Sequence, residues 1–124
     1  MKGKLILIVD DDTRNIFALK TVLLLNNYEV TTACDAEQCM EIIKGSKNLD
    51  LVLMDIMMPG KDGYDTIAEI RDHEEYAGLP IIAVTARAMT GDREKCLEAG
   101  ATDYISKPID IEMLLTMLLK YLPE

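Results

Sequence analysis

Residues 5–12 read LILIVDDD. Five apolar residues in succession are typical of a short strand that is buried on both faces of a sheet. Three acidic residues follow at once. Carboxylates this close repel one another, and burial would favour their protonated forms. The stretch therefore predicts a core strand that ends in a concentration of negative charge, and something else in the molecule must balance that charge.

Length and composition describe one acidic globular domain, which we expect to span residues 1–124. The net charge of −9 argues against non-specific binding to nucleic acid or anionic membranes and is compatible with a cation site. The chain begins with no signal-peptide pattern, and no apolar stretch approaches the roughly 18 residues of a membrane span. Its three cysteines lack metal-ligand spacing and are expected to be free thiols. These features predict a soluble, cytoplasmic protein.

Strand-like and helix-like patterns alternate along the whole chain. Strands are expected at 4–9, 29–33, 49–54, 81–85 and 103–106, and helices at 13–26, 36–45, 64–72, 90–99 and 111–121. A capping box formed by Asp35 and Gln38 is expected to open the second helix, and Asp110 to cap the last one. Such alternation predicts an α/β fold with a parallel sheet, in which right-handed crossovers place helices on both faces.

In open sheets of this kind, ligands bind beyond the carboxyl ends of the strands. The first strand is followed by Asp10 and Asp11, and the third by Asp55. The fourth strand ends at Thr85, and Lys107 follows the fifth. The topology therefore predicts that three acids, one hydroxyl and one ammonium group meet at one edge of the sheet.

This set of groups suits phosphoryl transfer to an aspartate. A hard cation such as Mg²⁺ would relieve the repulsion among the carboxylates, and it prefers oxygen ligands. Lys107 and Thr85 could then neutralise and hydrogen-bond a transferred phosphoryl group. A carboxylate can itself be the nucleophile. Asp55 stands alone at its strand end and is the favoured acceptor, whereas the adjacent Asp10 and Asp11 are better placed to hold the metal.

The chain resembles the receiver domains of two-component response regulators over essentially its whole length. The resemblance rests on IVDDD (8–12), LVLMDIMMPGKDG (51–63), AVTA (83–86) and DYISKP (103–108), in the family's order and spacing. It implies a flavodoxin-like doubly wound (βα)5 fold with a five-stranded parallel sheet in the order 2-1-3-4-5. It also implies a phosphodonor, either a histidine kinase or a histidine phosphotransfer domain.

For the metal site, the resemblance implies that Asp55 is the phosphoacceptor and one of the Mg²⁺ ligands. Asp11 would ligate Mg²⁺ directly and Asp10 mainly through water. The backbone carbonyl of Met57 would complete the protein ligands. Asp12 is expected to be the N-cap of the first helix, with metal ligation as the alternative.

For the phosphoryl group, the resemblance implies that Lys107 pairs with it and that Thr85 bonds one of its oxygens. Ala86 would be small enough to admit the donor. Tyr104 occupies the position of the aromatic switch residue, which would pass the signal to the surface of helix 90–99, strand 103–106 and the last helix. The Lys107–Pro108 peptide would be cis. Such a domain catalyses only its own phosphorylation and dephosphorylation and is not otherwise an enzyme.

Other interpretations concern the class and context of the protein. A haloacid-dehalogenase-like phosphatase would use Asp10 as its nucleophile, and a flavodoxin-like cofactor binder would need a phosphate-cradling loop that the sequence lacks.

The segment from 86 to 110, with Asn15, resembles receivers of hybrid sensor kinases, so the chain could belong to a longer protein. Met57 and Arg87 flank the expected entry for water and are predicted to tune the lifetime of the phosphate.

Overall fold

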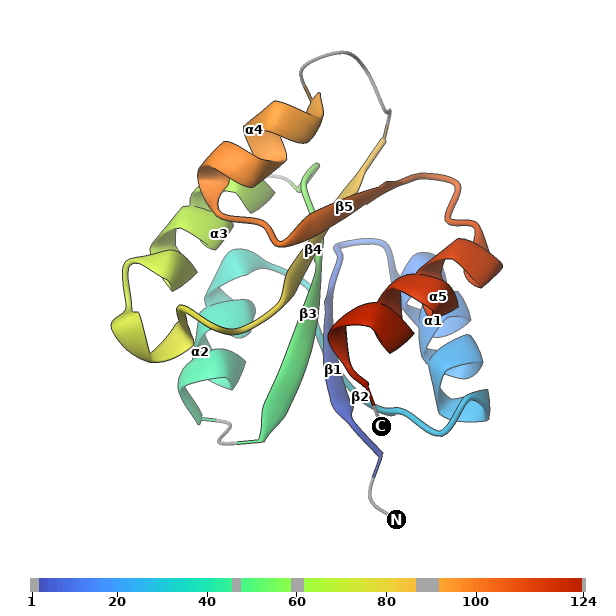
Figure 1. The fold of residues 1–124 in the computed structure, drawn as a ribbon. Helices are drawn as coiled ribbons and strands as arrows, with labels where there is room; N and C mark the ends of the chain where they lie inside the picture. Colours follow the sequence, from blue (N-terminus) through green and yellow to red (C-terminus); the bar gives the residue numbers. More distant parts are fainter. Residues whose placement is uncertain (1–2, 46–47, 59–61, 87–91, 124) are drawn as a thin grey trace.

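A computed structural model describes residues 3–45, 48–58, 62–86 and 92–123. Five parallel strands form one sheet in the order β2-β1-β3-β4-β5 (Figure 1). The strands are β1 (Leu5–Val9), β2 (Glu29–Ala33), β3 (Leu49–Asp55), β4 (Ile81–Thr85) and β5 (Asp103–Ser106). The helices are α1 (Thr13–Leu25), α2 (Ala36–Gly45), α3 (Gly63–Arg71), α4 (Asp92–Ala99) and α5 (Ile111–Tyr121), with a short 3₁₀ helix η1 (Glu74–Tyr76).

Helices cover both faces of the sheet, α1 and α5 on one side and α2, α3 and α4 on the other (Figure 1). Successive residues of a strand point to opposite faces. In β1, Leu7 and Val9 belong to the core beneath α2 and α3, whereas Ile6 and Ile8 belong to the core beneath α1 and α5. Both faces are buried, which explains why this strand is apolar throughout and does not alternate.

The predicted fold class and strand order are confirmed, and the element bounds shift by only a few residues. The predicted third helix begins one residue earlier, at Gly63, because the Asp62 side chain caps it by accepting a hydrogen bond from the Asp65 N–H at 3.0 Å. The 3₁₀ helix η1 was not predicted. Residues 90 and 91 of the predicted fourth helix lie outside the described residues.

The capping predictions hold with one correction. Asp110 caps α5 as expected, through the Met113 N–H. Asp35 accepts a hydrogen bond from the Gln38 N–H at 2.8 Å, but the capping box is incomplete. The Gln38 side-chain oxygen accepts from the Cys34 N–H at 2.9 Å, one residue earlier than a capping box requires.

Within the described ranges, no helix combines the length and the apolar character needed to cross a bilayer.

Candidate functional site

The carboxyl ends of the strands bring most of the predicted site residues together. Asp10 directly follows β1, Asp55 is the last residue of β3, and Lys107 directly follows β5. Neighbouring strands are in register at this edge, since Asp55 lies opposite Val84 and Thr85 opposite Ser106. The parallel arrangement thus places residues nearly a hundred positions apart in one site.

Three carboxylates form the acidic part of the site. One oxygen from each of Asp10, Asp11 and Asp55 lies within 4.8 Å of the others. Asp55 is only 2% exposed and Asp10 only 3%, whereas Asp11 faces solvent. Backbone N–H groups hold the two buried carboxylates, with Asp12 donating to Asp10 at 2.8 Å and Met57 donating to Asp55 at 3.1 Å. Two of the carboxylates are therefore fixed in orientation, and the third is exposed to solvent.

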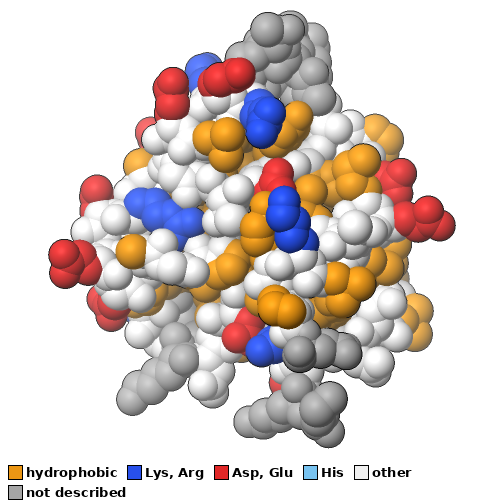
Figure 2. All heavy atoms as spheres, viewed as in Figure 1, with side chains coloured by type: hydrophobic (Ala, Val, Ile, Leu, Met, Phe, Trp, Pro, Cys, Tyr) orange, Lys and Arg blue, Asp and Glu red, His pale blue; other side chains and the backbone are white. Residues whose placement is uncertain are grey.

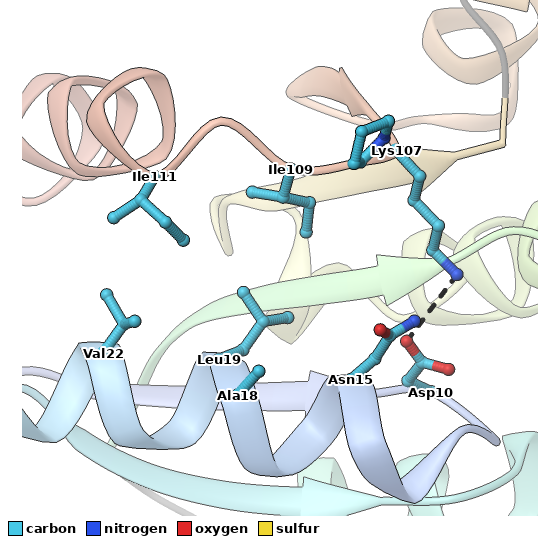
Figure 3. Close-up of a pocket in the computed structure, with 9 residues that line it drawn as sticks. Asp10, Asn15, Ala18, Leu19, Val22, Lys107, Ile109 and Ile111 are labelled. Carbon is cyan, nitrogen blue, oxygen red and sulfur yellow. Dashed lines mark ion pairs between the residues drawn. The ribbon is translucent and has the colours of Figure 1, made fainter.

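The Lys107 ammonium lies between the two buried carboxylates. Its Nζ atom is 3.4 Å from an Asp55 oxygen and 3.8 Å from an Asp10 oxygen, and the latter pair is drawn in Figure 3. Both distances exceed the roughly 2.7–2.9 Å of a tight charge-assisted hydrogen bond. The lysine therefore supplies charge to the site and keeps donor capacity for another acceptor.

The electrostatic balance of the site is negative. Burial and, second to it, the Asp10 charge raise the pKa of the Asp55 carboxyl to about 6, against the opposing effects of the Lys107 ammonium and the Met57 N–H. One ammonium cannot neutralise three carboxylates. Oxygen ligands with excess negative charge are what Mg²⁺ prefers, so the residues present fit that ion.

Gly63 lets the first turn of α3 pack against the end of β3. A Cβ atom at Gly63 would lie 2.5 Å from the Asp55 carbonyl oxygen and 2.6 Å from the Ile56 Cα. The Gly63 N–H also donates to the Ile56 carbonyl at 3.0 Å. Only glycine allows this close approach, which places α3 directly beside Asp55.

The remaining predicted site residues lie around this centre. Thr85 is buried at the end of β4, and Ala86 follows it in an exposed position. Tyr104 lies within β5 and packs, half-buried, against the core beneath α2 and α3. Met57 is 67% exposed beside Asp55.

The structure settles two local predictions near the site. Asp12 caps α1 by accepting a hydrogen bond from the Arg14 N–H at 2.9 Å, and it does not belong to the acidic cluster. The Lys107–Pro108 peptide is cis, as predicted. Arg87 lies outside the described residues.

One feature of the site was missed from the sequence: a groove between α1 and the start of α5. It has a volume of about 600 Å³ and opens beside Lys107 and Asp10 (Figure 3). Its walls are mainly apolar, and Asn15 adds an amide near the site; the lining residues are Asp10, Asn15, Ala18, Leu19, Val22, Lys107, Pro108, Ile109 and Ile111.

The outer side of α1 is also unusually apolar for a surface helix. Phe17 is 72% exposed and Leu25 is 77% exposed. The helix carries Arg14 and Lys20 but no acidic residue, although acids outnumber bases by 22 to 13 in the chain. The sequence signal was the run Leu23–Leu25, because three successive residues cannot all face the core of one helix.

A doubly wound α/β domain with a buried aspartate, an acidic cluster and a lysine at the strand ends has the architecture of a receiver domain. The profile of the response regulator receiver domain matches residues 6–119, and the chain belongs to that family.

Two curated relatives are similar to this chain over one part of their length. It is 40% identical to "Hybrid signal transduction histidine kinase I" of Dictyostelium discoideum, covering 96% of this chain and 7% of that protein. It is 38% identical to "Response regulator PleD" of Caulobacter vibrioides, covering 88% of this chain and 24% of that protein. The chain therefore spans less than a quarter of the length of these two relatives.

Solved structures match over nearly the full chain. A putative response regulator from Chloroflexus aurantiacus has a TM-score of 0.90 and 33% identity, with 99% of this chain and 100% of that chain covered. The receiver domain of sensor histidine kinase PA1611 from Pseudomonas aeruginosa has a TM-score of 0.89 and 37% identity, with 98% and 99% covered. That neighbour has a magnesium ion coordinated in its active site cleft. The haloacid-dehalogenase alternative finds no support in these matches.

Proposed function

We propose that residues 1–124 act as a single receiver unit in which Asp55 accepts a phosphoryl group from phosphohistidine in a Mg²⁺-dependent reaction. The observation that carries this proposal is the buried Asp55 carboxylate, 3.4 Å from the Lys107 ammonium within a cluster of three acids. An Asp55 oxygen would attack phosphorus, the P–N bond would break, and the histidine would leave with a proton on its ring.

The residues around Asp55 have distinct proposed roles. Asp10, Asp11, Asp55 and the Met57 carbonyl would hold Mg²⁺, which supplies charge neutralisation for the phosphoryl oxygens when bound. Lys107 has unused donor capacity and would pair with one of those oxygens.

Two neutral residues complete the proposed site. The Thr85 hydroxyl, at the end of the adjacent strand, would bond another phosphoryl oxygen. Ala86 would leave the entrance open to the donor.

The groove between α1 and α5 supports the choice of a protein as donor. It lies directly beside Lys107, and the neighbouring α1 surface exposes Phe17, Leu24 and Leu25. Exposed apolar side chains along a helix that starts beside a reactive centre suit protein docking. A histidine kinase or a histidine phosphotransfer domain would bury them while it presents its phosphohistidine to Asp55.

The output of phosphorylation would be a change at the surface of α4, β5 and α5, relayed by Thr85 and Tyr104. This face presents hydrophobic side chains next to acidic and basic ones (Figure 2), and α5 exposes Met113 and Leu119 on its surface. Such a mixture suits a protein partner or an attached output domain.

The test is to incubate the chain with Mg²⁺ and acetyl phosphate and to locate the adduct by peptide mass mapping. We expect a base-labile phosphoryl group on the peptide that contains Asp55 and none without Mg²⁺. Asp55→Asn should abolish labelling. Asp12→Asn is the matched control, since it removes an acid at the same edge and keeps an N-cap residue. An adduct on Asp10 would instead favour the phosphatase chemistry and overturn the proposal.

Met57 and Arg87 are proposed to control how long the phosphate survives. The Met57 side chain is largely exposed beside Asp55 and would restrict the approach of water. The half-life of the aspartyl phosphate should therefore differ among the parent chain, Met57→Asn and Arg87→Glu. Equal half-lives would show that neither residue has this role.

A further inference from the structure

Arg71, the last residue of α3, forms hydrogen bonds with η1 and with the residues that directly follow α4. Its Nε–H donates to the Gly100 carbonyl at 2.8 Å, and one terminal nitrogen donates to the Tyr76 carbonyl at 2.7 Å. The other terminal nitrogen lies 3.3 Å from the Thr102 hydroxyl oxygen. Within the described ranges Arg71 forms no ion pair with a carboxylate. The guanidinium fork therefore links the end of α3 to η1 and to the segment that follows α4.

The carboxyl end of α4 is shaped around this arginine. Gly100 has a φ of +114°, a conformation that other residues rarely adopt. A Cβ atom there would lie 2.6 Å from the Arg71 Cγ. The Gly100 and Ala101 N–H groups donate back to the carbonyls of Leu97 and Cys96, each at 3.0 Å. The helix end is thus closed by its own backbone on one side and by Arg71 on the other.

Thr102 extends the same anchor into the sheet. Its hydroxyl oxygen accepts a hydrogen bond from the Ile81 N–H at 3.0 Å, and its own N–H donates to the Ile81 carbonyl at 2.7 Å. Ile81 is fully buried at the start of β4. The end of α4 is therefore tied through Arg71 and Thr102 to the rigid centre of the fold.

Most of the side chains described in the rest of α4 are exposed. Among the side chains described in this helix, Cys96 is the only one that is fully buried. Arg93, Glu94, Leu97 and Glu98 are exposed, and so is Lys95, whose Nζ atom lies 5.6 Å from the centre of the Tyr64 ring. A helix of eight residues has little stability of its own. Among the described residues, Arg71 links the carboxyl end of this helix to α3 and η1.

We propose that Arg71 is the pivot of α4: when the domain switches, the helix swings about its carboxyl end, and its amino end moves. This inference rests on the proposed function for the phosphorylation that triggers the switch. The carboxyl end is held by hydrogen bonds to backbone groups that need not break, whereas Arg93, Glu94 and Lys95 in the preceding turn are exposed and can move without leaving a packed position. Arg71 is a positioning residue and lies away from the reacting atoms.

Hydrogen exchange measured by mass spectrometry tests the pivot, with and without phosphorylation by acetyl phosphate and Mg²⁺. In the parent chain, amides of 97–102 should exchange about tenfold more slowly than those of 92–96. Phosphorylation should change exchange at least about threefold in 92–96 and less than about twofold in 97–102. Equal changes in the two segments would mean that α4 moves as a unit, which overturns the proposal.

Two substitutions and a control separate the pivot from general stability. Arg71→Met should raise exchange in 97–102 about tenfold and extend the phosphorylation-induced change into that segment. Arg71→Lys keeps the charge, but one ammonium group cannot span the same acceptors, so it should behave like Arg71→Met. Arg93→Met is the control: it removes the same positive charge from an exposed position on α4. It should leave the exchange rates of 92–96 and 97–102 unchanged.

If exchange rose equally at all amides of the chain in the Arg71 variants, Arg71 would have a merely structural role, and the pivot would be refuted. Absence of an aspartyl phosphate in the mass spectrum would refute the proposed function instead. The exchange gradient along α4 in the unphosphorylated chain, and its loss in both Arg71 variants, would still decide whether Arg71 anchors the helix.

Discussion

Replacing Gly63 by alanine should damage both the fold and the acceptor site. The new Cβ atom would lie 2.5 Å from the Asp55 carbonyl oxygen and 2.6 Å from the Ile56 Cα, both of which are backbone atoms that cannot rotate away. Ordinary non-bonded contacts begin near 3.5 Å, so α3 and the end of β3 must separate by about 1 Å. That movement would displace Asp55 relative to Lys107 and Asp10.

The expected loss of stability follows from two opposing effects. Overpacking of this kind typically costs about 1–3 kcal/mol. Alanine also stabilises the folded state by up to about 1 kcal/mol, because it lowers the conformational entropy of the unfolded chain relative to glycine. The net loss in the free energy of unfolding should be roughly 0–2.6 kcal/mol, with a mid-range value of about 1.3 kcal/mol that lowers Tm by roughly 4–5 °C for a domain of this size. A displacement near 1 Å at the reacting group should also slow phosphorylation by at least about tenfold.

Urea unfolding and the rate of labelling by acetyl phosphate measure the two effects. Gly78→Ala is the matched control, because a Cβ atom at Gly78 would meet nothing within 4 Å. That variant should be unchanged or stabilised by up to about 1 kcal/mol and should be phosphorylated at the parent rate. If Gly63→Ala matched Gly78→Ala in both assays, the argument from close packing would be refuted.

Two smaller effects are also expected. The Tyr121 hydroxyl donates to Asp103 at 2.7 Å, and this bond, with burial, raises the pKa of Tyr121 to about 12; absorbance titration should show a normal pKa in Asp103→Asn. Because the pKa of Tyr121 is higher in the folded than in the unfolded chain, the stabilisation from its hydrogen bond is complete below about pH 10 and is lost as the pH rises through 12. At neutral pH, Tyr121→Phe should lower the free energy of unfolding by about 0.5 kcal/mol, as measured by urea unfolding. A thiol reagent should modify the exposed Cys34 rapidly but the buried Cys39 and Cys96 only on unfolding, since burial raises the pKa of Cys39 to about 12; fast reaction of all three in the native chain would contradict the structure.

The sequence was sufficient for the features that repeat locally. A run such as LILIV (5–9) shows a doubly covered strand because every residue must be apolar, and such runs alternate with helical patterns over the whole chain. Asp12 and Asp110 indicate helix starts because capping involves only the next few residues. The parallel topology then places the strand ends together, which was enough to predict that Asp10, Asp11, Asp55 and Lys107 meet.

Other features depend on contacts between distant segments. Arg71 appears in the sequence as one more surface charge near the end of a helix, yet it reaches Gly100 and Thr102, about thirty positions away. Leu23 and Leu24 are identical neighbours in the sequence, yet Leu23 is fully buried and Leu24 is half-exposed, because α1 offers the core only one stripe. Nothing local to either residue carries that information.

The sequence by itself determined the class of fold, the order of its elements and the groups that collect at the strand ends, because hydrophobic period, capping and parallel crossovers are local or topological constraints. The tertiary structure alone decided the 3.4 Å separation of Lys107 from Asp55, the packing of Gly63 on the acceptor strand and the groove between α1 and α5. Each of these depends on how side chains from separate elements fill a shared space, and packing is settled only when all of the elements are in place.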